Sequence, residues 1–279
     1  HGRKIVVEQG ELAKQATGSV LVRYNDTVIL TAVVVGKTAN LLSDFFPLTV
    51  NYQEKLYSVG KIPGGFIKRE GRPTDAATLA ARMIDRPIRP LFKEDFKHEV
   101  QIINTVLSVD QDCSPELAAM FGSSLATMLT GAPFLGPVAG VKIGYINDQF
   151  VVNPTQEELA NSKLDLTVAG TIDAITMVEA GSKELDEDTM LDALMLAHEE
   201  IKKLCKFQLD ILSNYDIKEM EYEKIEIEDE LRSEVESLCS KDIDEALRIK
   251  AKQERYQRLD EIKDNILTKY KEENKEAED

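Results

Sequence analysis

"DFFPLTVNYQEKLYSVGKIPGGFIKREGRPTDAATLAARMIDRPIRPLF", residues 44–92, carries the pattern that decides the fold of this chain. Residues 46–52 alternate apolar and polar side chains as a strand does, whereas residues 59–73 are rich in glycine and proline, as a loop is. The triplet Pro-Thr-Asp at residues 73–75 is a helix start signal, and apolar side chains then recur at helical spacing. The stretch therefore predicts a strand, a loop and a helix in succession.

The rest of the first 214 residues alternates hairpins with a few helices. Asn-Asp dipeptides at residues 25–26 and 147–148 are turn signals between β-rich segments. Pro87 and Pro90 are expected to end the helix that begins near residue 74. Neither a GxGxxG turn nor a P-loop occurs, so we assign this segment to the α+β class. Further strands are expected at residues 4–8, 18–23, 27–35, 99–109, 138–146, 149–152, 163–169 and 174–180, and further helices at residues 114–130 and 185–212.

The composition changes near residue 215. From there to the end the sequence has neither glycine nor proline, and apolar residues recur every three or four positions among dense charges. This pattern predicts a helical segment throughout, with a frayed end. We therefore expect two domains, an α+β domain at residues 1–214 and a small all-α domain at residues 215–279.

A basic run stands out against an acidic chain. The protein has 34 Lys and Arg residues against 50 Asp and Glu residues, a formal net charge of −16. Residues 1–150 hold 16 cations and 15 anions, and residues 151–279 hold 18 and 35, so the two parts carry net charges of +1 and −17. Within residues 61–93, eight cations accompany only three acids. The acidic part repels polyanions in general, but it does not exclude a local anion site in the basic run.

Other features of the sequence disfavour several classes of protein. Cys113, Cys205 and Cys239 lie far apart without zinc-type spacing, so we expect free thiols in a reducing cytoplasm. No apolar run is long enough to span a bilayer, and we expect a cytoplasmic protein that contacts no membrane. The first residue is His1 rather than Met, so we expect the chain to begin partway into a longer natural chain.

Residues 44–92 closely resemble the first core domain of the bacterial polynucleotide phosphorylase family. The stretches "INDQFVVNPTQEELANSKLDLTVAGT" (residues 146–171) and "IKAKQERYQRLDEIK" (residues 249–263) extend the resemblance over essentially the whole chain. It implies an RNase PH-like core with a ribosomal-protein-S5-domain-2-like βαβ architecture, followed by an all-helical domain. In the family a second RNase PH-like core and two RNA-binding domains follow.

The resemblance also implies a function for the whole protein. The family degrades RNA from the 3′ end, using phosphate to release nucleoside diphosphates, and forms a ring-shaped trimer with RNA threading a central channel. The implied partners are single-stranded RNA, two further copies of the chain and other proteins of RNA degradation.

The catalytic positions of the family are not matched in this chain. By resemblance, the phosphorolytic site belongs to the second core and uses two Asp residues that bind a metal, whereas the matching positions here are Asn153 and Leu159. Leucine cannot ligate Mg²⁺, which requires oxygen ligands. At the position matching the phosphate site, Glu116 would repel phosphate and Pro115 lacks an N–H donor. We therefore expect no catalytic residue, metal site or cofactor in this chain, with Mg²⁺ and phosphate bound elsewhere in the full enzyme.

The basic run matches the constriction loop of the family, usually Phe-Phe-Arg-Arg, and its form here is Phe-Ile-Lys-Arg at residues 66–69. A cationic groove with an aromatic platform holds single strands without sequence preference. The predicted RNA-binding residues are Phe66, Lys68, Arg69, Arg72, Arg82, Arg86 and Arg89.

Several alternatives stay open for the same residues. Phe66 could be buried in a core rather than displayed, and Arg72 could pair with Asp75. Internal ion pairs compete with RNA contact for the three helix arginines at positions 82, 86 and 89. For the chain as a whole, the alternatives are a stand-alone RNA or nucleotide-binding module and a structural piece whose RNA contacts need the complete ring.

Overall fold

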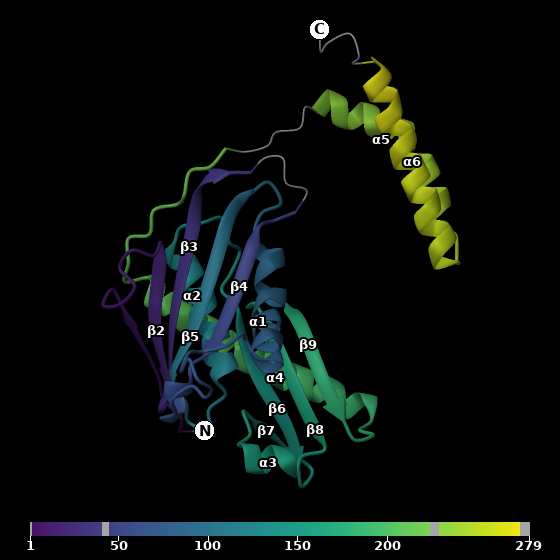
Figure 1. Ribbon diagram of the computed structural model, residues 1–279. Coiled ribbons are helices and arrows are strands. Elements are labelled where there is room, and N and C mark those ends of the chain that lie inside the picture. Colours follow the sequence, from purple (N-terminus) through teal and green to yellow (C-terminus); the bar gives the residue numbers. More distant parts are fainter. Residues whose placement is uncertain (1, 41–44, 224–228, 274–279) are drawn as a thin grey trace. The chain divides into compact units, whose positions relative to one another are not determined.

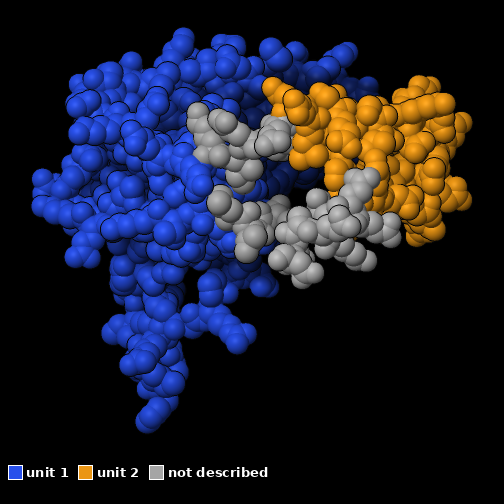
Figure 2. All heavy atoms as spheres, turned by 90° about the horizontal axis from the view of Figure 1, so that it is seen from above, with its two compact units in different colours: residues 1–223 blue, residues 224–279 orange. Residues whose placement is uncertain are grey.

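The computed structural model describes residues 2–40, 45–223 and 229–273 (Figure 1). Two compact units divide the chain, unit 1 at residues 1–223 and unit 2 at residues 224–279 (Figure 2). Each unit has its own apolar core and is described by itself. None of the helices in the described ranges has a long enough apolar stretch to cross a membrane.

The first sheet of unit 1 has the strand order β1-β2-β3-β5-β4. Neighbouring strands are antiparallel except β4 and β5, which are parallel and are joined through helix α1 (Asp75–Ile88). Two parallel strands joined by a helix form a βαβ unit, so the predicted succession of strand, loop and helix and the α+β class are confirmed. The strands are β1 (Ile5–Gln9), β2 (Gly18–Tyr24), β3 (Thr27–Ala39), β4 (Leu48–Glu54) and β5 (His98–Ser108), and the 3₁₀ helix η1 (Leu56–Val59) follows β4.

The second sheet is antiparallel, with the order β7-β6-β8-β9. Helix α2 (Pro115–Leu129) contacts β2 and β3 of the first sheet and β6 of the second, while α4 (Glu187–Leu212) packs on β6 and β8. Gly122 permits the close approach of α2 to β3, because a Cβ atom there would lie 2.6 Å from Thr31 Oγ1. The remaining elements are β6 (Ala139–Ile146), β7 (Gln149–Val152), α3 (Gln156–Ala160), β8 (Leu164–Gly170) and β9 (Ile175–Ser182).

A buried polar cluster fixes α2 on the first sheet. Thr31 on β3 donates a hydrogen bond to Asn104 Oδ1 on β5 at 2.6 Å, and Asn104 Nδ2 donates to Ser123 Oγ on α2 at 2.9 Å. All three residues are fully buried. Because buried polar groups need such partners, the cluster makes one arrangement of strand and helix better than any shifted one.

The two predicted Asn-Asp turns are confirmed, and α1 ends between the two prolines that were expected to end it. Asn147 and Asp148 both adopt positive φ, as the tight turn between β6 and β7 requires. Pro87, expected to end α1, is buried inside its last turn, and the helix continues to Ile88. A proline so close to the end removes one helical hydrogen bond, and burial of its ring in the core offsets that loss. The 3₁₀ helix η2 (Arg89–Leu91) follows directly.

The boundary between the units lies closer to the C-terminus than the predicted domain boundary at residue 215. Residues 216–223 are not helical, so the prediction of helix from residue 215 onward is wrong for this segment. Ile217, Met220 and Tyr222 pack on the core of unit 1, and the Tyr222 hydroxyl donates to the Asp95 carboxylate. This segment therefore belongs to unit 1, because its apolar side chains find their partners there.

Unit 2 is a pair of helices with a small core. The helices are α5 (Asp229–Leu247) and α6 (Lys252–Glu273), as the pattern predicts for this part of the chain. Cys239, Ala246 and Ile262 are buried between them, with four partly buried apolar side chains around these three. A core of this size stabilises a unit far less than the cores of unit 1.

We predict that the two units unfold separately and that the three thiols report this. Burial raises the pKa of Cys113 to about 11 and that of Cys205 to about 12, so both thiols of unit 1 stay protonated and slow to alkylate at pH 8 in the folded state. In increasing urea, Cys239 of unit 2 should react with iodoacetamide before the other two, as followed by mass spectrometry of the peptides. Exposure of all three thiols at one urea concentration would contradict this prediction.

Candidate RNA-binding site

The basic loop, residues 60–74, is held at both of its ends. It leaves η1 at Gly60 and enters α1 at Thr74, whose side chain accepts the N–H of Ala77 at 3.1 Å as a helix cap. Across its base, the Glu70 carboxylate accepts the backbone N–H of Leu56 at 2.9 Å. These contacts fix where the loop starts and ends, so its tip projects from a defined base.

The tip of the loop displays apolar side chains to solvent. Phe66 is 102% exposed, Ile67 is 73% exposed and Ile62 is 79% exposed. Gly65, at φ 74°, allows the reversal that places Phe66 at the tip, because positive φ is accessible to glycine without strain. Of the two alternatives for Phe66, the structure has the displayed one. A ring that packs on nothing in its own unit is free to stack on a ligand.

The cations around the tip are free of internal partners. Lys68, Arg69 and Arg72 are exposed, and none of them makes a hydrogen bond or an ion pair with any residue that the structure describes. The alternative pairing of Arg72 with Asp75 does not occur. Arg82, on the exposed face of α1, is free in the same sense. Free guanidinium and ammonium groups are available to anions such as phosphate.

Arg89 and Arg86 are occupied within unit 1. Arg89 forms a two-point ion pair with Asp85, at 2.7 and 3.0 Å, and donates to the carbonyl oxygens of Phe46 at 2.9 Å and Leu48 at 3.0 Å. Arg86 forms an exposed ion pair with Glu179 on β9 at 3.3 Å. This geometry favours the internal alternative for Arg89 and leaves Arg86 able to exchange a weak surface pair for another anion.

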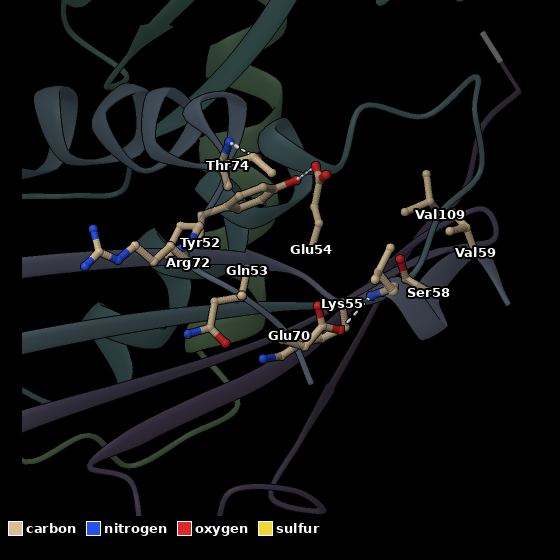
Figure 3. A pocket seen from close by; sticks show the side chains of 14 residues that line it. Tyr52, Gln53, Glu54, Lys55, Ser58, Val59, Glu70, Arg72, Thr74 and Val109 are labelled. Carbon is tan, nitrogen blue, oxygen red and sulfur yellow. Dashed lines mark hydrogen bonds between the residues drawn. The ribbon is translucent and has the colours of Figure 1, made fainter. Parts of the chain in front are cut away.

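A pocket of about 480 Å³ opens at the base of the loop (Figure 3). Its walls come from the end of β4, from η1, from residues 70–74 and from Ala77 and Val109. In Figure 3 the side chains of Gln53 and Arg72 extend to one side, opposite Val59 and Val109. The side of the pocket with Gln53 and Arg72 is therefore polar, and the opposite side combines Val59 and Val109 with the hydroxyl group of Ser58.

The residues that the sequence resemblance placed at catalytic positions of the family lie in structural surroundings. Asn153 Oδ1 accepts the N–H of Lys142 at 2.8 Å, and its Nδ2 donates to the Tyr24 hydroxyl at 3.4 Å. Leu159 lies on α3 and offers no ligand atom. At the N-terminus of α2, the Ser114 hydroxyl donates to Glu116 at 2.5 Å. Among the described residues, no cluster of His, Cys, Asp or Glu side chains could hold a metal ion.

Comparison with protein families decides the identity of this fold. Residues 1–133 match domain 1 of the 3′ exoribonuclease family, and residues 136–200 match its domain 2. The chain belongs to the 3′ exoribonuclease family. Residues 230–279 match a third model, described as the RNA binding domain of polyribonucleotide nucleotidyltransferase. The predicted resemblance to the polynucleotide phosphorylase family is confirmed.

The relatives of this 3′ exoribonuclease family member include several bacterial polyribonucleotide nucleotidyltransferases. That of Listeria welshimeri is 54% identical over 97% of this chain and 37% of its own length, and that of Bacillus subtilis is 52% identical over 98% and 38%. That of Listeria monocytogenes is 58% identical over 85% of this chain and 32% of its own length. The chain thus spans about a third of the length of the curated relatives it matches.

Unit 2 holds a second basic segment, to which the sequence analysis gave no role. Tyr256 on α6 is 53% exposed, and Lys252 Nζ and Arg255 Cζ each lie 5.8 Å from the centre of its ring. Five cations and one acid occupy residues 248–258, in an otherwise acidic part of the chain. A count of charges in short windows, rather than over the whole C-terminal half, could have found it.

We predict that Arg89 stabilises unit 1, whereas Arg82 does not. Arg89→Met should lower the free energy of unfolding by about 2 kcal/mol, because the change leaves Asp85 and two backbone carbonyl groups without their charged donor. Arg82→Met, the matched control on the same helix, should change it by no more than about 0.5 kcal/mol. Urea unfolding curves of both variants measure the difference, and equal effects would contradict the assignment.

Proposed function

We propose that this chain holds single-stranded RNA for a phosphorolytic 3′-to-5′ exoribonuclease that releases nucleoside diphosphates, and that it contributes no catalytic residue itself. The observation that carries the proposal is the loop tip, where a fully exposed Phe66 stands among cations without internal partners. The membership of the 3′ exoribonuclease family supports RNA as the ligand.

The loop offers the two interactions that a single strand needs. The ring of Phe66 can stack on a base of any identity, while Lys68, Arg69 and Arg72 can contact the phosphates on either side. Arg82 and Arg86 on α1 extend the cationic surface, whereas Arg89 acts mainly by supporting the helix. Because neither stacking nor phosphate contact reads base edges, the grip should tolerate every sequence.

The chemistry belongs to parts of the protein beyond this chain. In this proposal Mg²⁺ and phosphate bind where the relatives extend past the matched third of their length, and three copies assemble in the cytoplasm around the RNA. Asn153 and Leu159 support this division, since neither supplies the carboxylate that a magnesium site requires. Other proteins of RNA degradation are further partners in the proposal.

A second candidate is a module that binds RNA or nucleotides on its own. The pocket at the base of the loop favours it, because a concave site with polar groups at one end exists within a single unit. Binding by the isolated chain that rises with strand length would support this candidate, whereas binding only by a ring would support a purely structural role.

We predict that the chain alone does not phosphorolyse RNA. With poly(A), Mg²⁺ and phosphate, the pure chain should release no nucleoside diphosphate above background, because it lacks the metal ligands. The Bacillus subtilis relative serves as the positive control in the same assay. Release at a rate near that of the control would overturn the assignment of the chemistry to another part of the protein.

We predict separate signatures for the ring and the cations of the loop. Phe66→Ala should weaken binding of a short oligo(A) by about 1–3 kcal/mol, the value of one base stack, without changing its salt dependence. Arg69→Ala or Arg72→Ala should each reduce the slope of log K against log salt by roughly 0.7, because one phosphate contact is lost. Fluorescence anisotropy at several salt concentrations measures both.

The anisotropy assay is run on two forms, the chain itself and a form extended to the full length of its relatives. Catalysis is disabled in the extended form. Arg23→Ala is the matched control, since this guanidinium on β2 forms an exposed ion pair with Glu8 and its loss should leave the slope unchanged. If Arg69→Ala and Arg72→Ala leave both affinity and slope unchanged in both forms, the cations of the loop do not contact RNA and the proposal fails.

A further inference from the structure

The pocket at the base of the loop has more unused polar groups than a structural cleft needs. The side chains of Gln53, Lys55, Ser58 and Arg72 line it, and none of them makes a hydrogen bond or ion pair with a described residue. Lys55 and Ser58 are only partly exposed, so their polar groups are not simply spread into solvent. Unused polar groups that converge on one concavity are typical of a binding site.

Each of the two carboxylates of the pocket uses only one of its oxygens in a hydrogen bond within the protein. Glu70 accepts the Leu56 N–H through Oε1, and Glu54 accepts the Tyr52 hydroxyl through Oε1 at 2.9 Å. Burial, together with nearby Glu116 and Glu54, raises the pKa of Tyr52, so this phenol remains a neutral donor at every physiological pH. Each carboxylate therefore keeps its Oε2 for another donor, such as a hydroxyl group.

We propose that this pocket binds one ribonucleoside 5′-phosphate unit. The base packs against the apolar side chains of Leu56, Val59 and Val109. The phosphate accepts hydrogen bonds from the cations Lys55 and Arg72. The free oxygens of Glu54 and Glu70 accept hydrogen bonds from the ribose hydroxyl groups. A volume of about 480 Å³ has room for a base, a sugar and one phosphate.

The charge of the pocket limits the ligand further. Its two cations and two carboxylates sum to zero, and Glu116 adds a nearby negative charge. A ligand with one phosphate is therefore favoured over a di- or triphosphate. An anion without a base and a sugar, such as inorganic phosphate, should bind only weakly. The carboxylates also select ribose over deoxyribose, because without the 2′-hydroxyl an acceptor that the bound ligand covers loses its donor.

Two sources can supply this chemistry, a nucleotide within a bound RNA strand and a free mononucleotide. The first rests on the proposed function, since the pocket then receives a nucleotide of the strand held by Phe66. The second does not depend on it. The loop joins both regions, because Arg72 lines the pocket and lies six residues from Phe66 in the chain.

The test titrates the 279-residue chain with AMP, dAMP and inorganic phosphate by isothermal calorimetry, and with oligo(A) by anisotropy. Lys55→Gln removes a cation that lines the pocket and is not part of the loop tip. Lys61→Gln is the matched control, because Lys61 is an exposed cation outside the pocket. Lys55→Gln should weaken binding of AMP, of oligo(A) or of both about tenfold, because a charged hydrogen bond is lost, whereas Lys61→Gln should leave AMP binding unchanged. The 2′-hydroxyl should favour AMP over dAMP about fivefold.

The outcomes separate this inference from the proposed function. An effect of Lys55→Gln on AMP identifies the free nucleotide as the ligand, and an effect on oligo(A) alone identifies the strand. If AMP binds, equal binding of AMP and dAMP or equal binding of AMP and phosphate overturns the inference. No effect of Lys55→Gln on either AMP or oligo(A) also overturns it. If Lys55→Gln has no effect but Phe66→Ala loses affinity for oligo(A), the proposed function stands and only the inference about the pocket fails. If neither variant has an effect, both the inference and the proposed function fail.

Discussion

The guanidinium of Arg89 is the contact on which the geometry of the loop depends. It joins the end of α1, through Asp85, to the carbonyl groups of Phe46 and Leu48 at the start of β4. The basic loop connects the other end of β4 to the start of α1. One planar group thus fixes the strand before the loop against the helix after it, and four hydrogen bonds in a fixed fork hold that angle better than an ammonium group could.

With its frame fixed, the loop can leave its apolar side chains uncovered. Phe66, Ile62 and Ile67 contribute little to the stability of unit 1, because they pack on almost nothing. Stability comes instead from the two cores and from the cluster of Thr31, Asn104 and Ser123. The division is common in proteins that bind polymers, where a rigid scaffold supports exposed contact residues on loops.

Asn153, at a position where the family resemblance implied a metal ligand, has structural contacts in this fold. Its side chain accepts the N–H of Lys142 and reaches the Tyr24 hydroxyl, and its carbonyl oxygen accepts from Arg3. These bonds join the first and second sheets of unit 1. An amide can both donate and accept, whereas a carboxylate only accepts, so an asparagine holds two sheets together at this place better than an aspartate would.

Local sequence signals predicted the strands, the turns and the three long helices of unit 1 and the place of the basic loop, but not the short helix α3 or the display of Phe66, which they left open. They misplaced the domain boundary where tertiary contacts decide, at residues 216–223, which Ile217 and Met220 attach to unit 1. The helix arginines at positions 82, 86 and 89 look alike in sequence. Only the fold separates them, because Asp85 lies within one turn of both Arg82 and Arg89 but pairs with Arg89, and Glu179, the partner of Arg86, is far away in the chain.

The solvent-exposed apolar tip of the loop also bears on self-association of the protein. An exposed Phe flanked by two Ile residues would ordinarily promote self-association through its apolar surface. Lys68, Arg69 and Arg72 surround the tip with positive charge, so two tips repel each other before their apolar groups can touch. The same cations act as gatekeepers against aggregation, and only a partner that carries negative charge to the tip removes the repulsion and gains the apolar contact.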